Sequence, residues 1–114
     1  KRHRQWDLGK SLDTFCPMGP WITTADEIDF VKLTLRTEVN GEERQSGRAT
    51  EMIHSIPRLI ATISSGITLL AGDVIATGTP AGVGIGLDPP QFLRQGDEVR
   101  VSIDGLGSIQ NTFR

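Results

Sequence analysis

The residues best suited to chemistry lie in a glycine-rich stretch at residues 69–86, LLAGDVIATGTPAGVGIG. Pro80 biases Thr79 toward an extended conformation, and the glycines after it let the backbone turn tightly and approach another group. The Thr79 hydroxyl and nearby backbone N–H groups would then suit a small anionic ligand, because turn amides form anion-binding concavities. A tight turn between two strands is the alternative interpretation of the same residues.

Two nucleotide-binding motifs are excluded in this stretch. Gly82, Gly84 and Gly86 are followed by Asp-Pro-Pro at residues 88–90, where a dinucleotide-binding segment would open a helix. No Gly-Lys-Ser/Thr follows the glycines, so the stretch is not a phosphate-binding P-loop either. Neither nucleotide interpretation is retained.

Length and charge bound the class of protein. A chain of 114 residues makes one domain at most, and 37% hydrophobic with 23% charged residues is typical of a soluble globular protein. The net charge of −2 argues against a dedicated nucleic-acid surface, and the basic residues 1–4 predict a solvated segment. No apolar run is long enough to span a membrane. We therefore expect neither a nucleic-acid nor a membrane partner.

The other reactive side chains are isolated in the sequence. Cys16 is the single cysteine, so no internal disulfide is possible and a reducing compartment is expected. With no basic residue beside it, Cys16 is interpreted as a small buried hydrophobic residue. His54, just before a predicted helix, is expected to pack or cap rather than act as a base, and His3 is expected in solvent.

The clearest predicted elements that would position the glycine-rich stretch are a hairpin and a helix. Residues 31–39 alternate apolar and polar and predict a half-buried strand, and Asn40-Gly41 predicts a turn into a return strand at residues 42–45. Arg44 and Gln45 would then face either the mouth of a cleft or the strand edge.

The predicted helix begins after Ser55 as N-cap, carries Pro57 in its first turn and ends near Gly66. Its apolar residues recur at helical spacing on one face: Ile56, Leu59, Ile60 and Ile63.

The remaining predicted elements are short. They are a loop at residues 1–8, a strand at 12–16, buried Trp21 and Ile22, a helical turn at 25–28 capped by Thr24, a strand at 74–76, a turn at 92–93, a Gly-Asp turn at 96–97, a strand at 98–103 and a last strand at 108–113. Several short strands with many turns and a single helix indicate a β-rich fold of the α+β class, not an alternating βαβ protein.

Five segments together resemble one known family. In order they are GKSLDTFCPMGPWI at residues 9–22, VNGEERQ at 39–45, MIHSIPRLIATIS at 52–64, GDVIATGTPAGVG at 72–84 and GDEV at 96–99. At this spacing they resemble the catalytic domain of the fumarylacetoacetate hydrolase family, and most closely the branch called fumarylacetoacetate hydrolase domain-containing protein 2 and its bacterial relatives. The resemblance covers nearly the whole chain, and GDVIATGTPAGVG is its most specific part.

The resemblance implies a mixed β-roll fold, of which residues 1–114 would form the C-terminal portion of the catalytic domain, and a homodimer. It implies Mg²⁺ or Mn²⁺ and a small 2-oxo acid substrate, with hydrolysis of a C–C bond in β-diketo acids (acylpyruvase type), decarboxylation of oxaloacetate or isomerisation as the family's reactions. By position in the motifs, Lys10 would be the catalytic lysine that stabilises an enolate. Thr79 would act with it and, together with Gly78, hold the substrate carboxylate.

The metal ligands of the family are a Glu-x-Glu pair and an aspartate, all before the GKS motif, and this chain has no Glu-x-Glu. We therefore expect the ligands outside this chain, no metal ligand within it, and no turnover by it alone. The first residue is not methionine, so a piece of a longer enzyme is the leading hypothesis, in the cytoplasm or in mitochondria if the source is eukaryotic. A non-catalytic truncated paralogue that folds or dimerises, and a plain small-molecule-binding module, are the alternatives.

Overall fold

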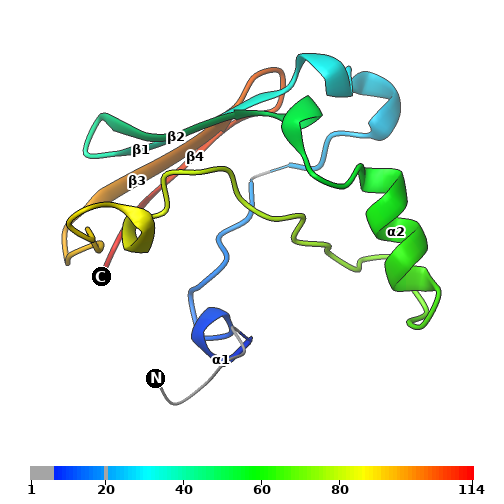
Figure 1. Ribbon diagram of the computed structural model, residues 1–114, viewed down its shortest axis with the longest axis horizontal. Helices are drawn as coiled ribbons and strands as arrows, with labels where there is room; N and C mark the ends of the chain where they lie inside the picture. The colour runs from blue at the N-terminus through cyan, green and yellow to red at the C-terminus, as the bar shows by residue number, and fades with distance from the viewer. Residues whose placement is uncertain (1–6, 20) are drawn as a thin grey trace.

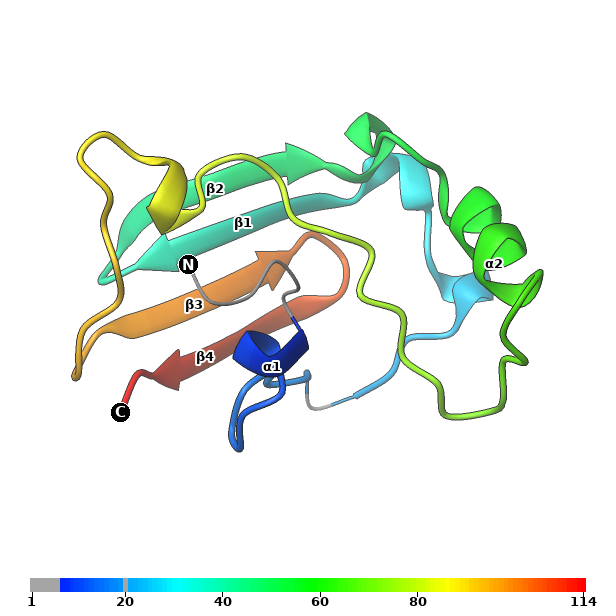
Figure 2. The ribbon, with the colours of Figure 1, turned by 60° about the horizontal axis from the view of Figure 1, so that its bottom comes forward.

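The computed structural model describes residues 7–19 and 21–114, and its largest element is a four-stranded antiparallel sheet. The strands are β1 (Thr34–Val39), β2 (Glu42–Arg48), β3 (Glu98–Ile103) and β4 (Gly107–Thr112), in the order β2-β1-β3-β4 (Figures 1 and 2). Two α-helices accompany it, α1 (Asp7–Lys10) and α2 (Ile56–Ser64). The α+β class with one main helix is confirmed, in agreement with the sequence.

Within residues 7–19 and 21–114, four short 3₁₀ helices complete the regular structure: η1 (Ala25–Glu27), η2 (Phe30–Lys32), η3 (Ala49–Glu51) and η4 (Gly84–Gly86). The predicted helical turn at 25–28 is confirmed as η1, and Thr24 takes its N-cap position without a side-chain cap hydrogen bond. The Thr24 hydroxyl instead hydrogen-bonds the Asp26 carboxylate and lowers the pKa of that group.

The predicted hairpin forms where the sequence places it. Asn40 and Gly41 have φ angles of 53° and 81°, as a two-residue hairpin turn requires at both positions. The Asn40 side chain also joins the hairpin to the Gly96-Asp97 turn: its Nδ2 donates to Asp97 Oδ1 at 2.9 Å, and its Oδ1 accepts from the Glu98 N–H at 2.9 Å. These two hydrogen bonds connect the turn at the end of β1 to the start of β3.

Two predicted strand boundaries shift. The strand predicted at 31–39 begins only at Thr34, because the Asp29 carboxylate accepts from the Val31 N–H at 3.3 Å and starts η2 instead. The return strand predicted at 42–45 continues to Arg48, since β1 supplies partners along that whole length. The strand predicted at 98–103 is confirmed as β3, and that predicted at 108–113 becomes β4.

Helix α2 follows its predicted caps. The Ser55 hydroxyl accepts from the Arg58 N–H at 3.4 Å, and Pro57 lies in the first turn. At the C-terminal end, the Gly66 and Ile67 N–H groups both donate to the Ile63 carbonyl, at 3.2 and 3.0 Å. Among the element pairs that pack closely are the three strand ladders and η2 with η3, and neither α1 nor α2 belongs to any of these pairs. No helix in the described ranges is both long and apolar enough to cross a membrane.

Several local predictions are wrong. Residues 12–16 form a turn rather than a strand, with a Phe15 N–H to Leu12 carbonyl hydrogen bond of 3.1 Å and positive φ angles at Thr14 and Cys16. The segment predicted as a loop at 1–8 contains the start of α1, and its first six residues lie outside the described residues. No regular turn forms at residues 92–93. Residues 74–76 do not form a strand, because no strand in the described ranges pairs with them.

The half-buried character predicted for the first strand is confirmed over β1. The burial predicted for Trp21, Ile22 and Cys16 is wrong, because the described residues bury no side chain completely. Trp21 is 62% exposed, Ile22 is 94% exposed, and Cys16 is exposed. The accessible surface of 9904 Å² greatly exceeds the roughly 6,100 Å² of a compact monomer of 12.4 kDa. The radius of gyration of 15.5 Å likewise exceeds the ~13 Å of a compact domain of this length. The chain therefore leaves much apolar surface that it does not cover itself.

Candidate functional site

The glycine-rich stretch is held against the second half of β2. The segment runs back from α2 and passes along β2 before reaching η4 (Figure 2). The Gln45 side-chain Nε2 donates to Thr79 Oγ1 at 2.7 Å and to the Pro80 carbonyl at 3.0 Å. Strand and loop, far apart in sequence, are thereby joined at the predicted ligand-binding threonine.

Glycines on both sides allow the backbones to meet. A Cβ on Gly82, whose φ is +100°, would lie 1.8 Å from the Arg44 carbonyl oxygen, which no side chain can tolerate. A Cβ on Gly47 would lie 2.9 Å from Pro80 Cβ. The expectation that the glycine-rich loop approaches another group closely is therefore confirmed, and that group is the backbone of β2.

A mostly apolar hollow of about 760 Å³ opens beside this contact. Its walls come from the ends of β1 and β2, η3, the start of α2 and residues 77–81. Gly78 and Thr79 both line it, and the exposed Thr79 side chain is accessible to a ligand. Gly78 has a φ of +112°, a conformation that strains any residue with a Cβ, so the backbone beside Thr79 depends on glycine.

The second predicted site residue, Lys10, is elsewhere. It is exposed in the last turn of α1 and does not line the hollow that contains Gly78 and Thr79. Figure 1 shows α1 well separated from the glycine-rich loop. The structure of this chain thus brings Gly78 and Thr79 together and leaves Lys10 apart, and the roles of all three stay predictions.

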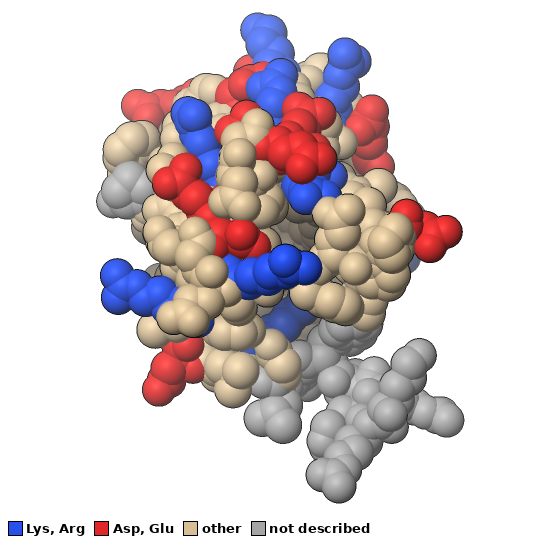
Figure 3. Space-filling model, turned by 90° about the vertical axis from the view of Figure 1, so that its left-hand side faces the viewer, with Lys and Arg blue, Asp and Glu red and all other residues tan. Residues whose placement is uncertain are grey.

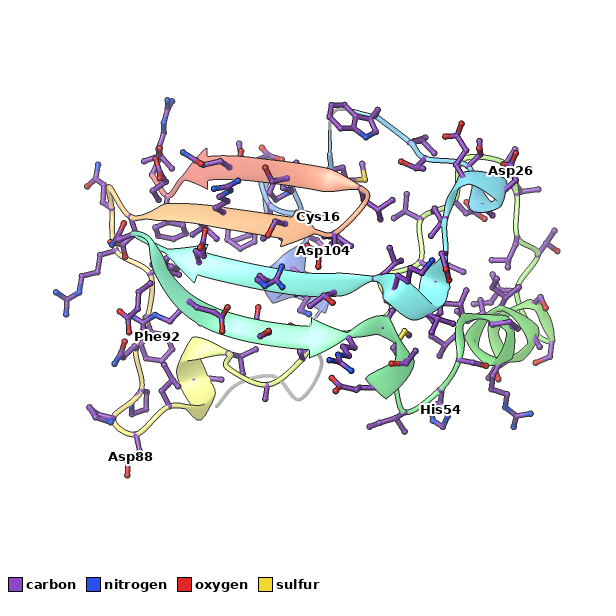
Figure 4. All side chains as sticks on the ribbon, turned by 90° about the horizontal axis from the view of Figure 1, so that it is seen from above. Cys16, Asp26, His54, Asp88, Phe92 and Asp104 are labelled. Carbon is purple, nitrogen blue, oxygen red and sulfur yellow. The ribbon has the colours of Figure 1, made fainter. Side chains whose placement is uncertain are left out.

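His54 lies in the connection between η3 and α2 and lines the same hollow (Figure 4). The residues that the structure describes contain no group of three or more His, Cys, Asp or Glu side chains placed to hold a metal ion. The donor set for a hard divalent cation, about six oxygens, does not fit these residues alone.

On one face of the molecule, charges are mixed rather than gathered around one site. Figure 3 shows acidic and basic side chains interspersed on the face that carries the hairpin end. Two further carboxylates with a lowered pKa, Asp29 and the half-buried Asp97, hold turns rather than lining the hollow. The Lys32 ammonium lowers the pKa of Asp29, and the Asn40 amide lowers the pKa of Asp97. Arg36 Nη1 and Asp104 Oδ1 form an ion pair of 2.9 Å next to the C-terminal end of β3 (Figure 4).

Gln45 is the residue that the sequence left undecided between the cleft mouth and the strand edge. Side chains two apart on a strand share a face, and Gln45 and Gly47 therefore face the loop together. The pattern in the sequence that could have indicated this contact is a long polar residue, Gln45, two positions before a glycine, Gly47, on one strand. Arg44, the neighbouring residue, instead hydrogen-bonds the Gln91 side chain beyond η4 and pairs with Glu42 at 3.2 Å.

Comparison with known proteins identifies relatives over the full chain. A family model described as the C-terminal region of fumarylacetoacetate (FAA) hydrolase matches residues 1–114. Oxaloacetate tautomerase YisK of Bacillus subtilis is 56% identical over 112 residues, which is 97% of this chain and 37% of that protein. The chain therefore spans little more than a third of the length of this relative.

Solved structures agree with the sequence relatives. A fumarylacetoacetate hydrolase from Exiguobacterium antarcticum superposes with a TM-score of 0.89 at 52% identity, over 92% of this chain and 38% of that one. A maleylpyruvate hydrolase from Sphingobium sp. SYK-6, solved with manganese(II) and pyruvate, superposes with a TM-score of 0.78 at 44% identity, over 88% of this chain and 36% of that one. The fold of this chain is the fold of the corresponding part of those proteins.

Proposed function

The chain belongs to the fumarylacetoacetate hydrolase family, and we propose that it is the C-terminal part of an enzyme's catalytic domain acting on a small 2-oxo or β-diketo acid. The observation that carries this proposal is the accessible Thr79 hydroxyl, held by β2 at the edge of a hollow, next to a glycine with positive φ. A hydroxyl and neighbouring N–H groups are suitable donors for a substrate carboxylate.

The reaction chemistry proposed for this site passes through an enolate. In a 2-oxo acid, loss of a proton or of an acyl group beside the keto carbon places negative charge on the keto oxygen. A positive charge near that oxygen lowers the barrier, because it interacts more strongly with the transition state than with the substrate. We assign this role to the Lys10 ammonium and the binding of the substrate carboxylate to Thr79 and Gly78.

The assignment of Lys10 requires α1 to lie nearer the hollow in the full-length protein. Helix α1 is short, belongs to none of the closely packed element pairs, and is followed by a turn at residues 12–16. Contacts with further protein surface would therefore decide where Lys10 lies.

The proposed cofactor is a divalent cation, Mg²⁺ or Mn²⁺. A related maleylpyruvate hydrolase binds manganese with pyruvate, whereas the described residues of this chain do not supply a ligand set. We therefore assign the metal ligands to other parts of the full-length protein. The roles proposed for Lys10, Thr79 and Gly78 do not include binding the metal ion.

Two reaction classes are candidates. Hydrolysis of a C–C bond in an acylpyruvate is the first, with support from the maleylpyruvate hydrolase at 44% identity. Tautomerisation of oxaloacetate is the second, favoured by the 56% identity to a tautomerase. Both, like decarboxylation of oxaloacetate, need a bound carboxylate and a stabilised enolate, so the proposed roles of Lys10 and Thr79 serve either.

We also propose that the full-length protein is a homodimer and acts in the cytoplasm, or in mitochondria if its source is eukaryotic, without nucleic-acid or membrane partners. The large uncovered apolar surface supports burial against further protein. Size-exclusion chromatography with light scattering of the full-length protein tests the dimer, and a monomer at micromolar concentration contradicts it.

Turnover of acetylpyruvate and oxaloacetate by the full-length protein, with Mg²⁺ and with EDTA, tests the function. We expect metal-dependent turnover of at least one substrate, with Lys10→Ala reducing kcat by at least about a hundredfold and Thr79→Val raising KM. Thr112→Val, on the exposed end of β4, is the matched control and should leave both constants unchanged. No turnover of either substrate by a folded protein, or unchanged constants in Lys10→Ala, contradicts the proposal and favours a non-catalytic role.

A further inference from the structure

We propose that Gln45 is a positioning residue that fixes the Thr79 hydroxyl as a hydrogen-bond donor toward the substrate carboxylate. This inference rests on the proposed function of Thr79 and deepens it. It concerns the direction of one proton, and it follows from the two hydrogen bonds that the Gln45 amide makes across the gap between β2 and the loop.

The Pro80 carbonyl decides the orientation of the Gln45 amide. A carbonyl oxygen only accepts hydrogen bonds, so the group that lies 3.0 Å from it must be the amide nitrogen and not the amide oxygen. The flipped amide would place two acceptor oxygens against each other. The same nitrogen lies 2.7 Å from Thr79 Oγ1, and both of its hydrogens are therefore used, one on each oxygen.

The orientation of the amide in turn decides what Thr79 can do. Its hydroxyl oxygen accepts from Gln45, which leaves the hydroxyl proton available for another acceptor. None of the hydrogen bonds within the described residues uses that proton. Accepting a hydrogen bond also polarises a hydroxyl and strengthens it as a donor. A Thr79 held in this way is a donor for an anion at the edge of the hollow.

Gln45 is not needed to hold the loop near the strand. On one side of it, the Gly82 backbone lies against the Arg44 carbonyl, and on the other side Pro80 packs on Gly47. These two contacts fix the spacing between strand and loop without any side-chain hydrogen bond. Replacing Gln45 should therefore change the direction of the Thr79 hydroxyl more than the path of the backbone.

Gln45→Met in the full-length protein is the first test, because methionine has nearly the same length and flexibility but no N–H donor. We expect KM for acetylpyruvate or oxaloacetate, whichever is turned over, to rise about tenfold or more, while kcat changes less than about threefold. This is the size of a hydrogen bond to a charged group. Calorimetric binding of pyruvate in the presence of Mn²⁺ should weaken by a similar factor.

Gln110→Met is the matched control, since Gln110 is an exposed glutamine on β4 and does not line the hollow that contains Thr79. It should leave KM, kcat and pyruvate binding unchanged. Thermal unfolding of each variant separates loss of fold from loss of positioning. A Gln45→Met protein that is folded and binds substrate normally overturns the inference.

The double variant Gln45→Met with Thr79→Val shows whether Gln45 acts through Thr79. If it does, the effect of Gln45→Met on KM should largely disappear once the hydroxyl is gone, because coupled residues are not additive. Full additivity would contradict a positioning role. If Thr79→Val alone leaves KM unchanged, the proposed function of Thr79 fails. If Thr79→Val raises KM and Gln45→Met does not, only the inference about Gln45 fails.

Discussion

The sheet and the segment at residues 67–96 differ in what holds them in place. Strands β1 to β4 pair with one another along their lengths, and the turns between them contain the residues that such turns require. The segment contains only η4 as regular structure, and Ile67, Leu70 and Val74 are each more than 60% exposed. A long segment without regular structure is uncommon within a compact domain.

The difference indicates that the two regions depend on different partners. The sheet is determined by its own backbone hydrogen bonds, which lie within this chain. The path of the segment is fixed near β2 by the glycine contacts, and Ile67, Leu70 and Val74 before that point are mostly uncovered within the described residues. Because the chain spans little more than a third of the length of its relative YisK, we infer that further protein surface covers them.

The largest expected effect comes from separating the two regions at their closest contact. In Gly82→Val, the new side chain would overlap the Arg44 carbonyl at a position with a φ of +100°. Backbone strain and steric overlap each cost about 1–3 kcal/mol, so we expect a loss of about 2–6 kcal/mol in the free energy of unfolding of the full-length protein, measured with urea.

The control for this change is Gly86→Ala. A Cβ there would meet only Val83 Cγ2 at 3.6 Å, an ordinary van der Waals distance. It should change the free energy of unfolding by less than about 1 kcal/mol, because alanine fits without strain at a position that lacks a positive φ. Equal losses in both variants would mean that the contact between Gly82 and β2 does not hold the regions together.

Amide hydrogen exchange gives the second test, on this chain alone and on the full-length protein. In the isolated chain, we expect amides at residues 74–78 to exchange at least about a hundredfold faster than those of β1, because they are not in a ladder. In the full-length protein the same amides should become protected. Equal exchange of 74–78 in both proteins would show that no further surface covers this segment.

Asn40→Ala should weaken the sheet by a smaller amount. Alanine at a φ of 53° is strained, and the hydrogen bond from the Glu98 N–H is lost. We expect a loss of about 1–2 kcal/mol in the free energy of unfolding. Asn40→Gly tolerates the positive φ and loses only the side-chain bonds, so the difference between the two variants measures the strain. Equal losses in both would contradict that contribution.

The same difference explains why the sequence predicted the sheet more accurately than the segment at residues 67–96. The Asn40-Gly41 hairpin, strand β3 and helix α2 are specified by turn residues, caps and alternation within a few positions. The strand predicted at 74–76 and the burial predicted for Trp21 and Ile22 each needed a distant partner, which a local pattern cannot supply. At the candidate site, the motif predicted roles for Thr79 and Gly78, and the structure places both at the edge of the hollow. The part played by Gln45 needed the pairing of β2 with a loop distant in sequence, and the placement of Lys10 is still not determined by this chain.

The smallest expected effect is a dependence of sheet stability on pH through Asp97. Hydrogen bonds from the Asn40 amide and then from the Arg94 N–H lower the pKa of Asp97 from its ordinary value of 3.8. A carboxyl whose pKa is lower in the folded state adds stability that is complete above its unfolded pKa and is lost as pH falls through the folded value. The free energy of unfolding of the wild type should therefore fall more steeply below about pH 4 than that of Asn40→Gly, which lacks the amide that lowers the pKa of Asp97.

The control is Asn111→Gly, at an exposed position of β4, which should retain the steeper slope. If wild type and Asn40→Gly lose stability in parallel from pH 5 to pH 2, the turn at Asp97 does not contribute, and the sheet depends on its backbone ladders alone.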